Sequence, residues 1–500
     1  MNRMRQTHTL FVLLSLFLIG CQPEKEQTSP PNIILFFVDD MGWQDTSVPF
    51  WDQPTNFNKT YKTPNMERLA KKGVKFTNAY ATPVCSPTRV SLMTGMNAAR
   101  HRVTNWTLQP DKLQPMELNH PTLAFPDWNY NGIGLEAATP NAAYAKPLPQ
   151  LLSEKGYFTL HAGKAHFGAI GYPSSNPINL GFQINIAGHA AGAPESYLGR
   201  ENFGNGKKGK EVWAVPGLEK YHGEDLFLTE VLSKEVRTAL DEPVAKKQPF
   251  FLYFALYGIH TPLMANDRYI KPYREKGMEE PEARYASMIE SMDTALGEVL
   301  DYLKANQLED NTIILFMSDN GGLSAVARGG EKHTHNLPLK SGKGSIYEGG
   351  IRVPFVAYWP SVIEPSRRSG HLAAHWDLMA TACDIAGLKL HDGTNSVSYL
   401  PLLKGTLDRQ KAHDFLYFEL HWPTKRSARK GQWVAVQKHT SSVDPSVNEI
   451  ELYNLENDLS QKFNVAEQFP EKVAEFKEIF LASHKQSEHF VFGQKRPQKA

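Results

Sequence analysis

The chain has 500 residues, of which 41% are hydrophobic and 21% are charged, which is the composition of an ordinary globular protein with room for one large α/β domain and a smaller one. Its 54 basic and 53 acidic side chains give a formal net charge of +1, so no global field would steer the protein to nucleic acid, and no nucleic-acid partner is expected. An anionic substrate would therefore have to be held by local charges.

The N-terminus predicts an exported lipoprotein. Two arginines precede an apolar run, Leu10 to Ile19, which is too short to span a bilayer and is typical of a signal peptide. The run ends in Leu18-Ile19-Gly20-Cys21, which resembles the bacterial lipobox and implies cleavage before Cys21 and acylation of its sulfur. We expect a signal peptide at residues 1–20, a tether at 21–31 and an outer-membrane anchor facing the periplasm or the surface. The alternative is a plain secretory signal.

Short apolar runs bounded by breakers predict buried parallel strands. There are four of them: Ile33 to Val38, Phe250 to Leu256, Thr312 to Met317 and Val353 to Trp359. Between them apolar residues recur at helical spacing, most clearly from Tyr285 to Leu303. Strands that alternate with helices predict an α/β fold, with a large, mixed and mostly parallel sheet sandwiched by helices, over residues 32–390.

After about residue 390 the pattern changes. Three short alternating runs precede an amphipathic stretch: Phe415 to Leu420, Trp433 to Val436, Ile450 to Tyr453 and then Val465 to Leu481. These runs predict a smaller C-terminal α+β subdomain, residues 391–500, built on a short antiparallel sheet with a terminal helix.

Polar residues stand directly after three of the predicted strands. They are Asp39-Asp40, Gly258-Ile259-His260 and Asp319-Asn320. In a doubly wound sheet ligands bind beyond the carboxyl ends of the strands, so these segments are expected at one site, which core packing alone does not predict. Residues 122–147 and 187–220 are expected to be long loops, which in compact domains are often binding loops.

The sharpest signal is Cys85-Ser86-Pro87-Thr88-Arg89, followed by Thr94-Gly95. Pro87 suits the first turn of a helix, which would place residue 85 at the positive helix end, a natural anion site. Arg89 lies four residues on and shares the helix face with Cys85. Taken alone, a cysteine at a helix start is more often a small buried hydrophobe than a nucleophile.

With its neighbours, this motif resembles the signature of the formylglycine-dependent sulfatases, Cys-x-Pro-x-Arg followed by Thr-Gly, and the match is complete. Further motifs similar to that family follow in the same order along the chain: Asp39-Asp40-Met41-Gly42, Gly163-Lys164-Ala165-His166-Phe167-Gly168, His260-Thr261-Pro262, Ser318-Asp319-Asn320-Gly321-Gly322 and Gly342-Lys343-Gly344-Ser345-Ile346-Tyr347-Glu348-Gly349-Gly350. The resemblance implies an alkaline-phosphatase-like fold and hydrolysis of a sulfate ester.

By that resemblance, a separate maturation enzyme oxidises Cys85 to formylglycine. One hydroxyl of the hydrated aldehyde would attack sulfur, and the second would expel sulfate afterwards. Position 85 would also share one Ca²⁺ ion, or less expectedly Mg²⁺, with four oxygen ligands: Asp39, Asp40, Asp319 and Asn320. These hard oxygen ligands suit either ion rather than zinc.

The resemblance also implies the roles of the other polar residues. Arg89, Lys164 and Lys343 would hold the sulfate oxygens or the formylglycine hydroxyl, an electrostatic clamp for a dianionic transition state. His166 would take the proton from the remaining hydroxyl, and His260 would donate a proton to the departing alcohol oxygen, roles that suit imidazoles at neutral pH.

The expected substrate is a sulfated polysaccharide or its oligosaccharides, of carrageenan, ulvan or glycosaminoglycan type, because a lipid anchor favours extracellular polymers and the segment from Gly181 to Tyr197 looks like that of bacterial polysaccharide sulfatases. Histidine and arginine can hydrogen-bond sugar hydroxyls or carboxylates, and tryptophan can stack on a sugar face. The substrate-binding candidates are His101, Arg102, His189 and His335, with Asn105, Trp106, Arg328 and His333 beside them.

Two other functions remain open. A phosphate or phosphonate monoester hydrolase of the same superfamily would generally need more positive charge or further metal ligands, and the sequence offers ligands for one metal. A non-catalytic lipoprotein that binds sulfated glycans would usually have lost a catalytic residue, yet all of them are present.

Overall fold

The computed structural model describes residues 30–112, 123–124, 129–324, 327–421, 424–438, 449–485 and 494–495. Cys21 and the predicted signal peptide lie outside these ranges. Within the described ranges, no helix has the length and apolar character needed to cross a bilayer.

An eight-stranded sheet organises the larger part of the molecule. Its strands, in spatial order, are β12 (Arg367–Ser369), β2 (Gly73–Phe76), β11 (Phe355–Tyr358), β10 (Thr312–Ser318), β1 (Asn32–Val38), β9 (Phe250–Ala255), β7 (Phe158–Gly163) and β8 (Ile184–Ile186). All of them except β11 run in the same direction. The first strand of the chain is therefore central, with Ile33 opposite Ile313 on one side and Phe251 on the other.

Helices cover both faces of the sheet, as the predicted sandwich requires. Alternate side chains of β1 enter two separate cores, Ile34 and Phe36 one of them and Ile33 and Leu35 the other. The first core is closed by α2 (Pro64–Lys71), α6 (Leu228–Ala245) and α8 (Glu280–Ala305), and the second by α3 (Cys85–Thr94), α5 (Leu148–Glu154), α10 (Asp377–Ala386) and α11 (Leu400–Leu403).

The remaining short elements connect these layers. They are α1 (Asn56–Thr60), α4 (Ala98–His101), α7 (Lys271–Glu275), α9 (Glu348–Ile351) and the two-residue strand pairs β3 (Ala79–Tyr80) with β13 (Ala373–Ala374), β5 (Ile133–Gly134) with β6 (Ala143–Tyr144), and β4 (Leu123–Ala124) with β18 (Gln494–Lys495).

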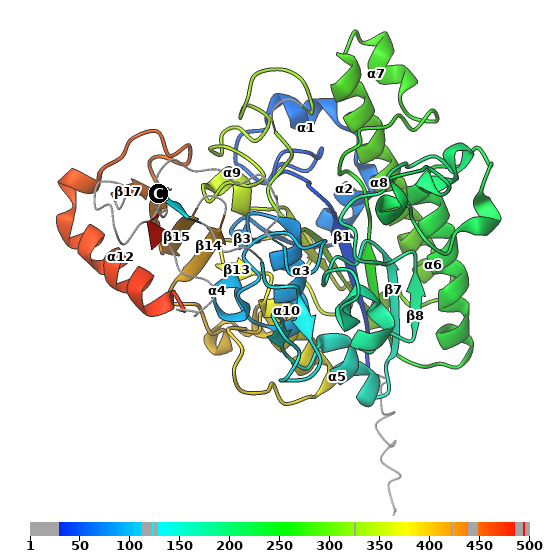
Figure 1. Ribbon diagram of the computed structural model, residues 1–500, viewed down its shortest axis with the longest axis horizontal. Coiled ribbons are helices and arrows are strands. Elements are labelled where there is room, and N and C mark those ends of the chain that lie inside the picture. Colours follow the sequence, from blue (N-terminus) through cyan, green and yellow to red (C-terminus); the bar gives the residue numbers. More distant parts are fainter. Residues whose placement is uncertain are drawn as a thin grey trace, which may run out of the picture.

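The C-terminal part is an antiparallel four-stranded sheet, made of β14 (Leu416–His421), β15 (Thr424–Lys430), β16 (Trp433–Lys438) and β17 (Ile450–Asn454). One face packs on α12 (Pro470–Ser483) through Phe476 and Phe480. The other face packs against Val84 and Tyr347 of the larger part, so this sheet supports the segment that leads into α3. Figure 1 shows α12 at one end of the molecule and α6 and α8 at the other.

The predicted fold class is confirmed, with one correction in the sheet. The run Val353 to Trp359 contains the buried strand β11, but β11 is antiparallel to β10. A strand buried on both faces has a continuous apolar sequence in either direction, so the sequence pattern did not reveal its orientation. Residues 187–220 contain only short 3₁₀ turns, as expected of a loop.

Candidate active site

Four strand ends bring polar residues together at one edge of the large sheet. Asp39 and Asp40 follow β1, Asp319 and Asn320 follow β10, and two further strands lead to basic residues, β7 to Lys164 and β9 to His260. The segments are tied directly, because the Asp40 amide donates to Asp319 Oδ1 at 3.1 Å and Asn320 Nδ2 donates to Asp40 Oδ1 at 2.9 Å. We call these strand ends, with residues 85–89 and Lys343, the catalytic edge.

Cys85 lies at the first position of α3, directly above this edge. The preceding residue, Val84, is extended and offers no side-chain acceptor to the first turn, which leaves the helix N-terminus for an anionic ligand. Cys85 is only 4% exposed. Burial raises the pKa of its thiol, and the nearby Lys164 and Lys343 only partly offset that effect. An unmodified Cys85 is therefore a protonated thiol at neutral pH and a poor nucleophile.

Two buried cations bind carboxylates of the edge. Arg89 donates from Nη2 to Asp319 Oδ2 at 2.9 Å and from Nη1 to the Lys164 carbonyl at 2.8 Å. Lys164 Nζ lies 2.5 Å from Asp39 Oδ2. All four side chains of these two ion pairs are completely buried. The predicted cations are thus held rigidly by the predicted metal ligands.

The third cation, Lys343, reaches the edge from the loop before α9. Its Nζ lies 2.7 Å from Asp40 Oδ1, and its side chain is 20% exposed. Burial alone would raise the pKa of Asp40, but Lys343 and then His260 outweigh it and lower that pKa. Asp39 differs: burial and the neighbouring Asp319 raise its pKa well above the ordinary value. The edge therefore pairs three cations with three carboxylates.

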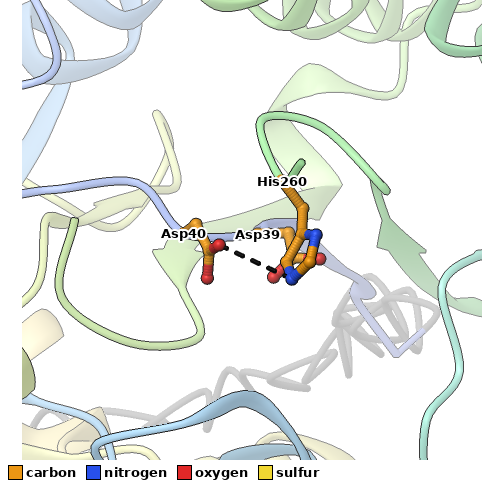
Figure 2. A group of neighbouring side chains, drawn as sticks. All are labelled: Asp39, Asp40 and His260. Atoms are coloured by element: carbon orange, nitrogen blue, oxygen red, sulfur yellow. Dashed lines mark ion pairs between the residues drawn. The ribbon is translucent and has the colours of Figure 1, made fainter. Parts of the chain in front are cut away.

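The edge also offers the kind of oxygen ligands that a hard metal ion binds. Asp39 Oδ1 and Asn320 Oδ1 are buried, and neither has a hydrogen-bond partner among the described residues. Asp39, Asp40 and His260 offer ligand atoms within 4.8 Å of one another (Figure 2). Unpartnered buried oxygens that converge in this way fit a Ca²⁺ or Mg²⁺ ion. His260 Nε2 lies 3.7 Å from Asp40 Oδ2, so it joins the cluster that the sequence predicted.

The two predicted catalytic histidines are both held by backbone carbonyls. His166 Nε2 lies 2.7 Å from the Thr107 carbonyl, so this nitrogen carries the proton, and Nδ1 has no partner among the described residues. Burial and Lys164 keep the pKa of His166 well below its ordinary value. His260 Nδ1 lies 2.7 Å from the Thr261 carbonyl, and burial and Lys343 lower its pKa to about 3. Both rings are therefore neutral at pH 7.

A cavity of about 640 Å³ opens over these groups, and Cys85, His166, His260 and Lys343 all line it. The cavity is also lined by residues of the long segment 187–220 and by Trp106, which lies much earlier in the chain. The wall residues are Trp106, Gly192, Ala193, Pro194, Glu195, Lys210 and Trp213. The predicted binding loop therefore does border the site.

The four predicted substrate-binding residues do not line this cavity. His101 is 2% exposed and faces Ser91 Oγ at 2.9 Å. Arg102 donates to the Tyr130 hydroxyl at 3.1 Å, and His335 stacks on Phe57. His189 acts through its backbone, because its carbonyl accepts from the His166 amide at 3.2 Å.

Of the other candidates, Arg328 lies away from the cavity and Trp106 lines it. Arg328 is 1% exposed and forms buried ion pairs with Asp45 and Glu282, which brace the turn after β1. Trp106 lines the cavity as the sequence suggested. Lys210 and Trp213 were missed; their only signal was their position in a long Gly- and Lys-rich loop.

The sheet order, the covering helices and the site at the carboxyl ends of the strands define an alkaline-phosphatase-like fold. A sulfatase family model matches residues 31–388, and a model described as the C-terminal part of N-sulphoglucosamine sulphohydrolase matches residues 341–485. The chain belongs to the sulfatase family.

Several relatives and structures are similar to it. An N-acetylgalactosamine-6-sulfatase of Mus musculus is 30% identical over 72% of this chain, which spans only 63% of that protein's length. An N-acetylgalactosamine-6-O-sulfatase of Bacteroides thetaiotaomicron is 26% identical over 92% of this chain and 96% of its own length. A crystal structure of Ps i-CgsB in complex with k-i-k-neocarrahexaose has a TM-score of 0.72 and 28% identity, and covers 92% of this chain and 95% of that one.

Proposed function

We propose that this protein hydrolyses sulfate esters on a sulfated polysaccharide or its oligosaccharides, with formylglycine made from Cys85. The observation that carries the proposal is the convergence of Cys85, Lys343, His166 and His260 on one cavity above a carboxylate-rich sheet edge. Hydrated formylglycine would supply one hydroxyl to attack sulfur and a second whose deprotonation allows sulfate to leave. The hydrolysis consumes one water and yields an alcohol and sulfate.

The three cations of the catalytic edge would hold the sulfuryl oxygens. Arg89 and Lys164 are fully buried and fixed by carboxylates, so they need no reorganisation when charge develops. Lys343 borders the cavity and is the cation with the best access to a bound substrate. Asp39, Asp40, Asp319 and Asn320 would hold Ca²⁺, which supplies Lewis-acid stabilisation of negative oxygens.

His166 is suited to take the proton that must leave before sulfate is released. Its Nε2–H is engaged with the Thr107 carbonyl, which leaves Nδ1 as the basic nitrogen. Burial, and after it the neighbouring Lys164, lower the pKa of His166 and so keep its ring neutral, which is the form that a base requires.

His260 is suited to protonate the departing alcohol oxygen once a substrate is bound. Its pKa of about 3 means that few molecules carry the proton at pH 7 before substrate binds. An anionic sulfate ester beside Nε2 favours the imidazolium and raises that pKa. Substrate binding and protonation of His260 are therefore coupled in this mechanism.

A sugar fits the aromatic and charged wall of the cavity. Trp106 and Trp213 are half-buried, so each presents part of an indole face, and the exposed Lys210 is free to approach an acidic group. Among similar proteins, one structure holds a neocarrahexaose and two relatives are described as sulfatases of N-acetylgalactosamine. These observations support a sulfated glycan as the substrate.

We also propose that the protein is exported and anchored through a lipid on Cys21. The support is the lipobox-like sequence Leu18-Ile19-Gly20-Cys21 after an apolar run. Palmitate labelling in a bacterial host and fractionation of its membranes test this proposal. Label and outer-membrane location that are lost in Cys21→Ser support it, whereas an unlabelled wild-type chain in the soluble fraction refutes it.

The function is tested by peptide mass spectrometry of the protein from its own host, together with sulfate release from a panel of sulfated oligosaccharides. We expect formylglycine at position 85 and release of sulfate from one sugar class. Phosphate release that exceeds sulfate release would favour the phosphate or phosphonate monoester hydrolase. An unmodified Cys85, with glycan binding but no turnover, would favour the non-catalytic lipoprotein.

A further inference from the structure

A second large cavity lies where the main sheet meets the C-terminal sheet. Its volume is about 580 Å³, and none of its lining residues lines the catalytic cavity. Its walls come from the loop after β1, the turn after β2, the ends of α9 and β12, the turn between β15 and β16, and the segment after β17 (Ile450–Asn454). We call it the arginine pocket and define it by Trp51, Asn78, Arg352, Arg368, Arg429 and Gln432.

Arg429 is the unusual group of this pocket because it is buried without a full set of partners. It is 7% exposed, and its only side-chain hydrogen bond among the described residues runs from Nε to the Gly431 carbonyl at 3.2 Å. Its Nη1 is enclosed and has no hydrogen-bond partner there. The nearest carboxylate oxygen, Glu348 Oε2, lies 3.6 Å from Nη1. Burial accordingly lowers the pKa of Arg429 to about 10.

Glu348 lies near Arg429 but does not hydrogen-bond to it: its Oε2 already serves other donors, and its Oε1 is buried and makes no hydrogen bond among the described residues. Its Oε2 accepts from the Tyr80 hydroxyl at 2.8 Å and from Arg352 Nη1 at 3.1 Å. Arg352 is fully engaged, since it also donates to the Thr77 carbonyl at 2.7 Å. Two buried guanidinium groups thus share one carboxylate. A buried charge without a partner is unfavourable, so the floor of the pocket is suited to receive an anion.

The rim adds groups that would recognise more than a bare anion. Arg368 is half-exposed and pairs with the exposed Asp52. Trp51 is half-buried and offers part of its indole ring, and the side chain of Gln432 is exposed. The remaining acidic group on the lining, Glu456, is exposed to solvent, so it does not neutralise the buried floor.

We propose that the arginine pocket is a second, non-catalytic binding site for a sulfate ester group of a sulfated oligosaccharide. The Arg429 guanidinium donates to the sulfate oxygens, with the planar geometry that suits tetrahedral oxyanions. The sugar ring lies against Trp51, and Gln432 hydrogen-bonds its hydroxyls. The choice of a glycan as the ligand rests on the proposed function. The observation of a surplus buried cation is independent of it.

Such a site would hold the polymer while the catalytic cavity processes another part of it. Two linked contacts raise the effective concentration of substrate at the catalytic edge. The effect would appear with long substrates and be absent with small sulfate esters that cannot reach both cavities.

The test uses the full chain with Cys85→Ala and Ca²⁺, so that no turnover occurs. Calorimetry measures binding of carrageenan and chondroitin sulfate hexasaccharides, their desulfated forms and inorganic sulfate. We expect two binding events per chain with at least one sulfated hexasaccharide. Arg429→Gln should weaken one event about tenfold or more, as expected when a charge-assisted hydrogen bond is lost.

The matched control is Lys430→Gln, which removes one charge from the other face of β15, where Lys430 pairs with Glu475. It should leave both events unchanged. If Arg429→Gln does not fold, Arg368→Gln serves instead, because that side chain is 48% exposed. A single binding event, or equal loss in the control, overturns the proposal.

The ligands separate the remaining outcomes. Weaker binding of the desulfated hexasaccharides supports recognition of sulfate on a sugar. Equal affinity for inorganic sulfate and for the sulfated hexasaccharides at the Arg429-dependent event overturns the glycan assignment. A matured wild-type chain that releases no sulfate while the Arg429-dependent event persists would refute the proposed function alone.

Discussion

The catalytic edge and the arginine pocket are both built around buried cations, but their charges are balanced differently. At the catalytic edge each of three cations has its own carboxylate, as in the pair of Lys164 with Asp39. In the arginine pocket Arg352 and Arg429 share Glu348. Because its cations and carboxylates are equal in number, the catalytic edge gains affinity for an anion only when a divalent ion is added. A surplus guanidinium attracts an anion directly. In the two proposals, the two regions would thus hold sulfate in physically different ways.

Among the tests that distinguish the two regions, Cys85→Ala should have the largest effect. Sulfate release should fall at least about a thousandfold, because the nucleophile is removed. The fold should persist, because only a small side chain is truncated. Sulfate release and thermal unfolding measure the two effects. Activity near the wild-type level would remove the mechanism, and Cys383→Ala, a second buried cysteine, is the control.

Removal of the metal ion by a chelator should have the next largest effect and should again distinguish the two regions. EGTA or EDTA should abolish most sulfate release, since the balanced edge loses the ion that makes it attractive to an anion, and added Ca²⁺ should restore it. Binding at the arginine pocket should continue unchanged, because guanidinium groups need no metal. Full activity in excess chelator would contradict the assignment of Asp39, Asp40, Asp319 and Asn320 as metal ligands.

Stability should fall when one cation is removed from the catalytic edge, but not when one is removed from the arginine pocket. Lys164→Met leaves Asp39 buried without its partner and should lower the free energy of unfolding by about 3 to 5 kcal/mol. Arg429→Met removes one of the two cations that share Glu348 and should leave that free energy within about 1 kcal/mol or raise it. Urea unfolding measures both. Equal destabilisation would show that Arg429 is fully compensated.

The two cavities should also differ in how well a glycine of their lining tolerates replacement by alanine, which adds one methyl group. A Cβ at Gly192 would lie 2.3 Å from the His166 ring, so Gly192→Ala should displace that base and lower kcat roughly tenfold to a hundredfold. A Cβ at Gly370, in the arginine pocket, would lie 3.8 Å from its nearest neighbour, Asn78. Gly370→Ala should leave kcat on a small sulfate ester unchanged. Similar kcat values for both variants would argue against the role of His166.

The smallest effect concerns a one-to-one pair at the border of the two sheets. His413 Nε2 lies 2.8 Å from Asp377 Oδ1. Burial alone lowers the pKa of His413, but Asp377 outweighs it and raises that pKa. The stabilisation is complete below about pH 6.5 and is lost as pH rises through the folded-state pKa. His413→Gln should flatten this slope in unfolding measured from pH 6 to 9, and an unchanged slope would place its origin elsewhere.

The convergence of the carboxylates at one sheet edge could be predicted because these residues follow strands directly. Asp39 and Asp319 need only the strand ends to meet, and parallel pairing of β1 with β10 ensures this. Strand β7, which leads to Lys164, was not predicted, because His161 interrupts its apolar pattern and is buried against Asn185. A polar residue that finds its partner only in the folded state cannot be recognised locally.

The cavity walls were predicted poorly for a related reason. Trp213 and Lys210 belong to a loop without periodicity, so nothing in the local sequence shows which side chains turn towards the site. His101 was a reasonable candidate by type, yet its helical position directs it to Ser91. The arginine pocket collects residues from several separate segments, and its surplus charge exists only after Glu348 has been engaged by Tyr80 and Arg352.

The central position of β1 also determines when, during synthesis of the chain, the large core can form. Its Ile33 must wait for Phe251 and Ile313 before the sheet can close, so the large core cannot form while the ribosome is still producing the middle of the chain. At roughly 5 to 20 residues per second, the stretch from Cys85 to Ser318 takes roughly ten to fifty seconds to synthesise. Any protein that oxidises Cys85 must act within this interval or on an unfolded chain, because the finished structure leaves that side chain 4% exposed.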